Sequence, residues 1–240
     1  MSRAHTVLLA LLMLHVLMGA LCLAVGRGSR ESKALRYWGA TLLTFALGSV
    51  VTITTPLPYH LKQVVGNSLI TLAAYLACIG LASVAGASID RVWMTSWFAV
   101  CVGVIAGAHV VGQPVLPVDV VRIVDVGVPA VFASVGYLSC AYLLWSWPPE
   151  EARAGARFCA VTIVIMVVVW NVRTLSIWFA LAGAPDSDGA DLAISIFAIV
   201  QMLFLVAMSL GLLWIEVRRV DAALERAARE ALEASRAKSV

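Results

Sequence analysis

The sequence predicts an all-α integral membrane protein, a seven-transmembrane-helix bundle followed by a C-terminal cytoplasmic helical stalk. Of the 240 residues, 62% are hydrophobic and only 13% are charged, a balance that a soluble domain of this size cannot bury. Seven apolar stretches of about 20 residues follow one another, and each is long enough to cross a hydrocarbon core of ~30 Å. A charged, helix-forming tail then closes the chain.

Short, well-marked breaks separate the seven expected spans. Pro56 and Pro58 follow the second span, and Pro148 and Pro149 follow the fifth, where proline cannot continue a helix without losing a backbone hydrogen bond. Because the connections have only about 5–12 residues, consecutive spans should be antiparallel neighbours. The expected spans are Thr6–Val25, Tyr37–Thr55, Val64–Val84, Val92–Val111, Arg122–Ser146, Phe158–Ala182 and Leu192–Ile215.

The basic residues set the expected orientation, with the N-terminus outside and the C-terminus in the cytoplasm. Lysine and arginine beside a span resist translocation across the membrane. In this orientation the outer segments hold only Arg3, Lys62 and, at the boundary, Arg122, while Arg173 lies within a span. The net charge of +3 therefore reflects membrane orientation, and the lipid bilayer is the expected partner rather than nucleic acid. The inner segments hold thirteen of the 17 basic residues: Arg27, Arg30, Lys33, Arg36, Arg91, Arg153, Arg157, Arg218, Arg219, Arg226, Arg229, Arg236 and Lys238.

Polar side chains within the spans are the candidate site residues, because they are costly in a bilayer and usually serve a function there. A rise of 1.5 Å per residue puts most of them in the outer part of the bundle, with Gln201 and His15 nearer the midplane. Arg173 can extend along the membrane normal towards Asp125, so we predict an ion pair between them. The candidate ligand-binding residues are Asn67, His109, Asp125, Asn171, Arg173 and Gln201.

Three interpretations of these polar residues stay open. They form a structural network in which Arg173 pairs with Asp125, or a site for a small polar or anionic ligand that opens to the outside, or a proton or ion path. The last is disfavoured because no chain of acidic residues crosses the bilayer. We expect neither catalytic residues nor a metal site, since the sequence holds no nucleophile–base pair and no C-x-x-C motif.

No cofactor is expected. Lys33, Lys62 and Lys238 are the lysines of the chain, and none lies within a span, which excludes a retinal Schiff base. His15 and His109 stand at different depths and make a poor pair of haem ligands. The cysteines fall in five different spans and are expected to be packed thiols rather than disulfides: Cys22, Cys78, Cys101, Cys140 and Cys159.

Two further features concern helix packing. Gly103 and Gly107 form a G-x-x-x-G motif in the fourth span, and small residues at this spacing let helices approach closely, within a bundle or across a dimer. Pro129 is expected to kink the fifth span.

The tail, residues 216–240, is expected to form a cytoplasmic signalling helix beyond a sensor domain at residues 1–215. It contains neither glycine nor proline up to Lys238, and strong helix formers dominate it. Apolar residues recur at spacings of three and four, as in a parallel two-stranded coiled coil. The alternative is an amphipathic helix on the inner leaflet, for which alanine is a poor anchor. The expected seam of the homodimer is Val217, Val220, Leu224, Ala227 and Ala231.

Parts of the chain resemble bacterial signalling proteins. Residues 35–38 (L-R-Y-W), 45–48 (F-A-L-G), 57–58 (L-P) and 65–67 (V-G-N) resemble the N-terminal membrane modules of diguanylate cyclases and sensor histidine kinases. Residues 230–239 (E-A-L-E-A-S-R-A-K-S) are similar to the linker before the phospho-acceptor helix of hybrid histidine kinases. The resemblance implies that the phosphorylated-histidine box would follow in a longer protein, and it carries over no ligand residue.

The expected function is therefore sensory. A seven-helix sensor of the bacterial inner membrane, dimeric through its stalk, would pass a stimulus from the outer half of the bundle to a cytoplasmic histidine-kinase output in a two-component phosphorelay. The chain itself is expected not to be an enzyme. The alternatives are an input module of a diguanylate cyclase, or a small seven-helix transporter or accessory membrane protein. A transporter should show repeated halves and discontinuous helices, which the sequence does not contain.

Overall fold

The computed structural model describes residues 3–27, 32–54, 56–87, 90–112, 117–148, 150–182 and 187–238, and all regular structure within these ranges is helical. This confirms the all-α class. Seven of the described helices are long and apolar enough to cross a membrane. The helices are α1 (Arg3–Arg27), α2 (Lys33–Thr54), α3 (Tyr59–Val84), α4 (Arg91–Gly107), α5 (Val118–Ser146), α6 (Arg153–Ala182) and α7 (Ser187–Lys238), with a π-helical turn η1 (Ala108–Gly112) and a 3-10 turn η2 (Glu150–Ala152).

The helices begin earlier than the expected spans, because hydropathy marks the apolar stretch and not the polar first turn. Thus α3 starts at Tyr59 and α6 at Arg153. Pro58 and Pro117 stand directly before α3 and α5, where the missing N–H of proline costs no helical hydrogen bond. The fourth expected span, Val92–Val111, matches a described apolar helical segment at Val92–Val110, whose last turn is π-helical. Outside the described residues lie Arg30, Thr55, Pro114 and Pro149.

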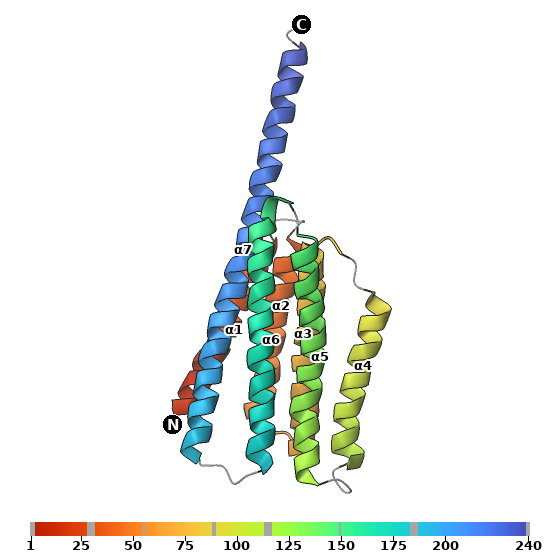
Figure 1. The fold of residues 1–240 in the computed structure, drawn as a ribbon, viewed down its shortest axis with the longest axis vertical. Helices are drawn as coiled ribbons and strands as arrows, with labels where there is room; N and C mark the ends of the chain where they lie inside the picture. Colours follow the sequence, from red (N-terminus) through yellow and green to blue (C-terminus); the bar gives the residue numbers. More distant parts are fainter. Residues whose placement is uncertain are drawn as a thin grey trace.

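Six helices form a closed ring. Each consecutive pair packs together, as expected, and two further contacts, between α3 and α5 and between α1 and α7, complete the circle α1–α2–α3–α5–α6–α7. Helix α4 lies outside this ring against α3 and α5, at the edge of the molecule in Figure 1. The N-terminus lies towards one end of the bundle, and α7 extends far beyond the other end (Figure 1).

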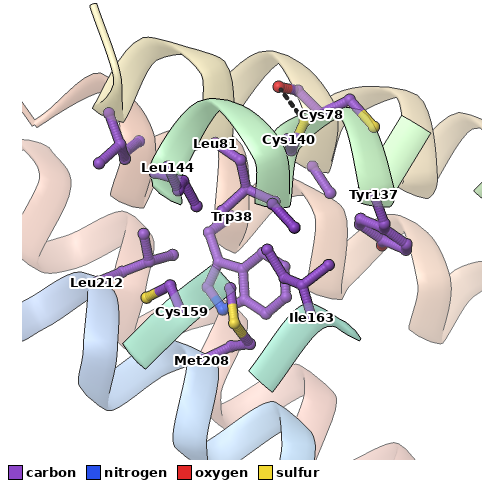
Figure 2. Packing of buried hydrophobic residues seen from close by; sticks show 14 of the residues in the cluster. Trp38, Cys78, Leu81, Tyr137, Cys140, Leu144, Cys159, Ile163, Met208 and Leu212 are labelled. Atoms are coloured by element: carbon purple, nitrogen blue, oxygen red, sulfur yellow. Dashed lines mark hydrogen bonds between the residues drawn. The ribbon is translucent and has the colours of Figure 1, made fainter. Parts of the chain in front are cut away.

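The core gathers around Trp38 in the half of the bundle nearer the extended part of α7. Figure 2 shows Trp38 of α2 surrounded by side chains from α3, α5, α6 and α7, among them Leu81, Leu144 and Ile163. The indole N–H of Trp38 donates to Ser209 Oγ of α7 at 3.0 Å, so its one polar group is satisfied. All five cysteines are buried and free, as the sequence led us to expect, and they pack as small apolar groups.

Gly48 of α2 and Gly66 of α3 set the closest approach of these two helices. A Cβ atom added to Gly48 would lie 2.9 Å from the carbonyl oxygen of Gly66, and one added to Gly66 would collide with Thr52 Oγ1. The G-x-x-x-G motif of α4 is different. Among the described residues, no atom of another helix lies within 4 Å of a Cβ added to Gly103 or Gly107, so these two positions do not pack against the described bundle.

These two environments predict opposite effects of the same substitution. Gly48→Ala should lower the free energy of unfolding by about 1–3 kcal/mol, because the new methyl group meets backbone that must move. The matched control Gly103→Ala should leave it unchanged or raise it by up to about 1 kcal/mol, since alanine is the better helix former. Equilibrium unfolding in detergent would measure both, and equal stability of the two variants would contradict the packing described here.

Candidate functional site

A cavity of about 270 Å³ lies inside the ring, slightly below the ~300–1,000 Å³ of typical ligand sites. It occupies the half of the bundle away from the stalk, since it is lined by early residues of α1, such as Leu8, and early residues of α7, such as Phe197. All six ring helices contribute to it, mostly with aliphatic and aromatic side chains. Its polar lining residues are His15, Ser49, Thr52, Asn67, Asp125, Arg173 and Gln201.

The cavity brings together four of the six candidate residues from the sequence, Asn67, Asp125, Arg173 and Gln201. His109 lies behind Asp125 and supports it from outside the ring. Asn171 does not line the cavity, because its Nδ2 donates to Ser134 Oγ of α5 at 2.8 Å and to the carbonyl of Val167 at 2.8 Å. It therefore ties α6 to α5 and does not join the candidate residues that line the cavity.

A buried pair joins η1 to α5. His109 Nε2 lies 2.7 Å from Asp125 Oδ1, and the side chains are 0% and 8% exposed. Tyr59 at the start of α3 covers the imidazole edge-on, with 6.3 Å between ring centroids. Asn67 lies beside the same carboxyl group. Because an uncompensated carboxylate is costly in this setting, His109 and Asn67 together hold Asp125 in place.

The pair is satisfied on one side only. His109 Nδ1 is buried and has no hydrogen-bond partner in the described part of the chain. In either tautomer of the imidazole, this second nitrogen stays without a partner, which is costly in a buried position. The Asp125 carboxyl group is thus held by His109 and Asn67, and Arg173 brings a guanidinium to the same cavity.

The predicted ion pair between Arg173 and Asp125 is wrong. Both line the cavity, but among the described residues Asp125 pairs with His109, and Arg173 forms no salt bridge. The guanidinium carbon of Arg173 instead lies 4.1 Å from the ring centroid of Phe197 on α7, a cation–π contact. The depth argument placed the two charges at similar heights. It could not show that His109, from the π-helical turn that follows α4, pairs with Asp125 instead.

Sequence reasoning missed the contribution of α2. Phe45, Ser49 and Thr52 line the cavity, and their spacing of four and three residues puts them on one helix face. That spacing could have indicated the inward face of α2. Hydroxyl side chains are common in membrane spans, however, because they can donate a hydrogen bond to a carbonyl of their own helix. Here Ser49 Oγ donates to the Phe45 carbonyl at 2.9 Å and Thr52 Oγ1 to the Gly48 carbonyl at 2.8 Å. His15 also lines the cavity, stacked on Phe45 with 4.8 Å between centroids.

One face of α7 connects the cavity with the core. Phe197 and Gln201 line the cavity, and a smaller hollow of about 30 Å³ continues from Gln201 towards Trp38 and Phe204. Phe204 packs edge-on against Trp38 at 6.4 Å between centroids, and Ser209 accepts the hydrogen bond from the Trp38 indole. The same face of α7 therefore contacts both the cavity and the core residues around Trp38.

The same helix is held where it leaves the bundle, and we call this contact the stalk exit. Buried Glu216 accepts a hydrogen bond at Oε2 from Ser32 Oγ at 3.2 Å. Arg219 Nη2 donates to the carbonyl of Val84 at 2.6 Å, one of the last carbonyls of α3, which have no partner within the helix. Arg219 Nη1 also lies 3.6 Å from Glu216 Oε1. These contacts fix α7 against the residue preceding α2 and the C-terminal end of α3.

Beyond Arg219 the helix is mostly exposed. Arg226 Nη2 there lies 3.8 Å from Glu151 Oε1 of the bundle. Further along, Arg229 Nη2 pairs with Glu225 Oε2 of the preceding turn at 3.3 Å. Helix α7 passes through residue 216 without interruption, so the expected boundary between residues 1–215 and 216–240 is a change of exposure and not of secondary structure.

Comparisons of the chain with protein-family models, curated proteins and solved structures find no match. No group of three or more His, Cys, Asp or Glu side chains in the described part of the chain is arranged to hold a metal ion. The arrangement is a small cavity whose mostly apolar wall carries a carboxyl group, a guanidinium, an imidazole, two amides and two hydroxyl groups.

Two double-mutant cycles test the pairing in the cavity. We expect His109→Ala and Asp125→Ala to be coupled by about 1–3 kcal/mol in the free energy of unfolding, because either change leaves a buried partner unsatisfied. The matched cycle of Arg173→Ala with Asp125→Ala should show a clearly smaller coupling. Stronger coupling in the second cycle would restore the ion pair that the sequence predicted.

Proposed function

We propose that this chain is a membrane-embedded sensor domain, which binds a small polar or anionic molecule in the cavity and transmits the change through α7 to a cytoplasmic output domain. One observation carries the proposal. Helix α7 is continuous from Ser187 to Lys238, so the helix that lines the cavity with Phe197 and Gln201 is also the helix that forms the exposed stalk.

The proposed setting is the inner (plasma) membrane of a bacterium, with the N-terminus outside and the stalk in the cytoplasm. Seven helices of sufficient length and hydropathy support membrane insertion. The distribution of basic residues supports this orientation. In this orientation the cavity lies in the outer half of the bilayer, as expected for a site that samples molecules outside the cell.

The charges of the cavity indicate its ligand class. Arg173 offers a guanidinium that the described carboxylates do not neutralise, and it suits a carboxylate or another anionic group. Gln201 and Asn67 supply amide groups. A ligand that draws Arg173 away from Phe197 would change a contact between α6 and α7 directly. Binding would thus favour one of two positions of α7 in the ring.

The stalk is proposed to work as a parallel homodimer. Val217, Val220 and Leu224 are 56%, 49% and 65% exposed in the single chain, and they lie on the seam expected from the sequence. A second copy would cover them as a coiled coil. The output would be a histidine kinase, as the tail's resemblance suggests, with a diguanylate cyclase as the alternative output.

Cysteine crosslinking tests the dimeric stalk. In a variant that lacks the native cysteines, single cysteines from Val217 to Ala231 should crosslink between subunits with a period near 3.5 residues. Maxima should fall at Val217, Val220, Leu224, Ala227 and Ala231, measured as the dimer fraction on denaturing gels of oxidised membranes. Uniform crosslinking along the stalk would favour a helix lying on the membrane surface and would contradict the proposed stalk.

A second experiment tests transmission from the cavity to the stalk. Ala130→Phe places a ring in the cavity, and it should change the crosslinking rate of Leu224→Cys at least twofold by displacing α7. The matched control is Val131→Phe, because Val131 is the next residue of α5 and is 51% exposed, facing away from the cavity. Membrane yield of each variant would report folding. Identical rates in folded Ala130→Phe and the parent would contradict the transmission.

A further inference from the structure

A second hollow lies on the outer surface of the bundle, away from the cavity. Helices α5 and α6 form an apolar groove of about 420 Å³ in the half of the bundle nearer the stalk. Within each helix, the lining residues are either adjacent in sequence or three to four positions apart, so they lie on one face of that helix. The groove is lined by Leu138, Ala141, Tyr142 and Trp145 of α5 and by Ala160, Val161, Val164 and Ile165 of α6.

One end of the groove carries a positive charge. The guanidinium carbon of Arg157 lies 5.3 Å from the ring centroid of Trp145, and Arg157 stands one turn before Val161. Among the described residues Arg157 forms no salt bridge.

Aromatic rings mark the same level of the bundle. Trp145 and Tyr142 are 53% and 62% exposed, and Trp147 packs edge-on against Tyr142 at 5.8 Å between centroids. Tryptophan and tyrosine prefer the level of the lipid headgroups. From its end to its interior, the groove therefore presents a cation, then aromatic rings, then aliphatic side chains. These correspond in order to the phosphate, the headgroup level and the acyl chain of a phospholipid.

We propose that this groove binds one anionic phospholipid, with an acyl chain along α5 and α6 and the phosphate on Arg157. From Arg157 to Ile165 the helix rises about 12 Å, most of the ~15 Å that one leaflet's hydrocarbon occupies. Arginine binds phosphate through two parallel N–H groups, and its contact with Trp145 holds it at the end of the groove. The proposal rests on the membrane insertion of the proposed function, but not on ligand binding in the cavity or on the dimeric stalk.

A helix from a second copy fits the groove less well. Packing a helix across it would cover the Arg157 guanidinium, which has no carboxylate partner, and burying such a charge is costly. A phospholipid leaves the guanidinium at the headgroup level and supplies the missing anion. The charge at the mouth therefore selects an anionic lipid over both an apolar helix and a lipid with a neutral headgroup.

Native mass spectrometry of the detergent-purified full chain tests this inference. With added phosphatidylglycerol, we expect one lipid to be retained, and phosphatidylcholine of the same chains to be retained several-fold less. Arg157→Gln should lower phosphatidylglycerol retention about fivefold, the effect of about one basic contact with an anionic lipid. The matched control Arg27→Gln removes an exposed arginine at the end of α1 and should change nothing.

A second pair of variants tests the chain-binding part. Val164→Phe fills the groove and should lower retention of phosphatidylglycerol, whereas Val168→Phe, one turn along α6 and outside the groove, should not. Equal retention of the two lipids, or equal loss in Arg157→Gln and Arg27→Gln, would overturn the anionic-lipid site. Loss of retention only in Val164→Phe would mean that the groove binds acyl chains regardless of the headgroup, and it would overturn the role of Arg157. Stalk crosslinking reports the sensor function separately, so either proposal can fail alone.

Discussion

The packing of α7 between α1 and α6 closes the ring, and the rest of the structure depends on this closure. Without it the polar side chains of the inner surface would not share an enclosed space. With it they face a common cavity. The first half of α7 is therefore a wall of the cavity, and because no residue interrupts the helix, the wall and the stalk are one rigid element.

The electrostatics of the cavity follow from a helix that does not belong to the ring. Helix α4 packs outside it, yet its terminal π-turn carries His109 to Asp125. Turns of this kind are rare and are frequent at functional sites. Because His109 occupies the carboxylate, Arg173 rests on Phe197 of α7 instead. Arg173 therefore contacts α7, the helix that forms the exposed stalk, and not a counter-ion on α5.

Helix α7 makes different contacts at three levels. Phe197 and Gln201 line the cavity, Ser209 is bound to the central tryptophan, and Glu216 is held at the stalk exit. The stalk exit joins a buried carboxylate to groups at the ends of two other helices, so the proposed movement of α7 would have to exchange those contacts. The groove between α5 and α6, for which we propose a phospholipid, lies on a different face of the bundle.

The sequence by itself determined the helical class, the number of apolar segments and the uninterrupted last helix. Hydropathy, proline positions and helix propensity are local properties, and they act over about 20 residues. The same reasoning found Asn67, Asp125, Arg173 and Gln201, because a polar residue in an apolar segment is conspicuous wherever the segment packs.

Only the tertiary structure decided which polar groups meet. Asp125 takes His109 and not Arg173, Asn171 turns to Ser134, and Ser32 reaches Glu216 across the chain, because these choices depend on which helices are neighbours and on how each is rotated about its axis. The exclusion of α4 from the ring, the close approach at Gly48 and Gly66 and the inward face of α2 have the same origin. Rotation and neighbourhood are set by the packing of many side chains together, and no single segment of sequence contains that information.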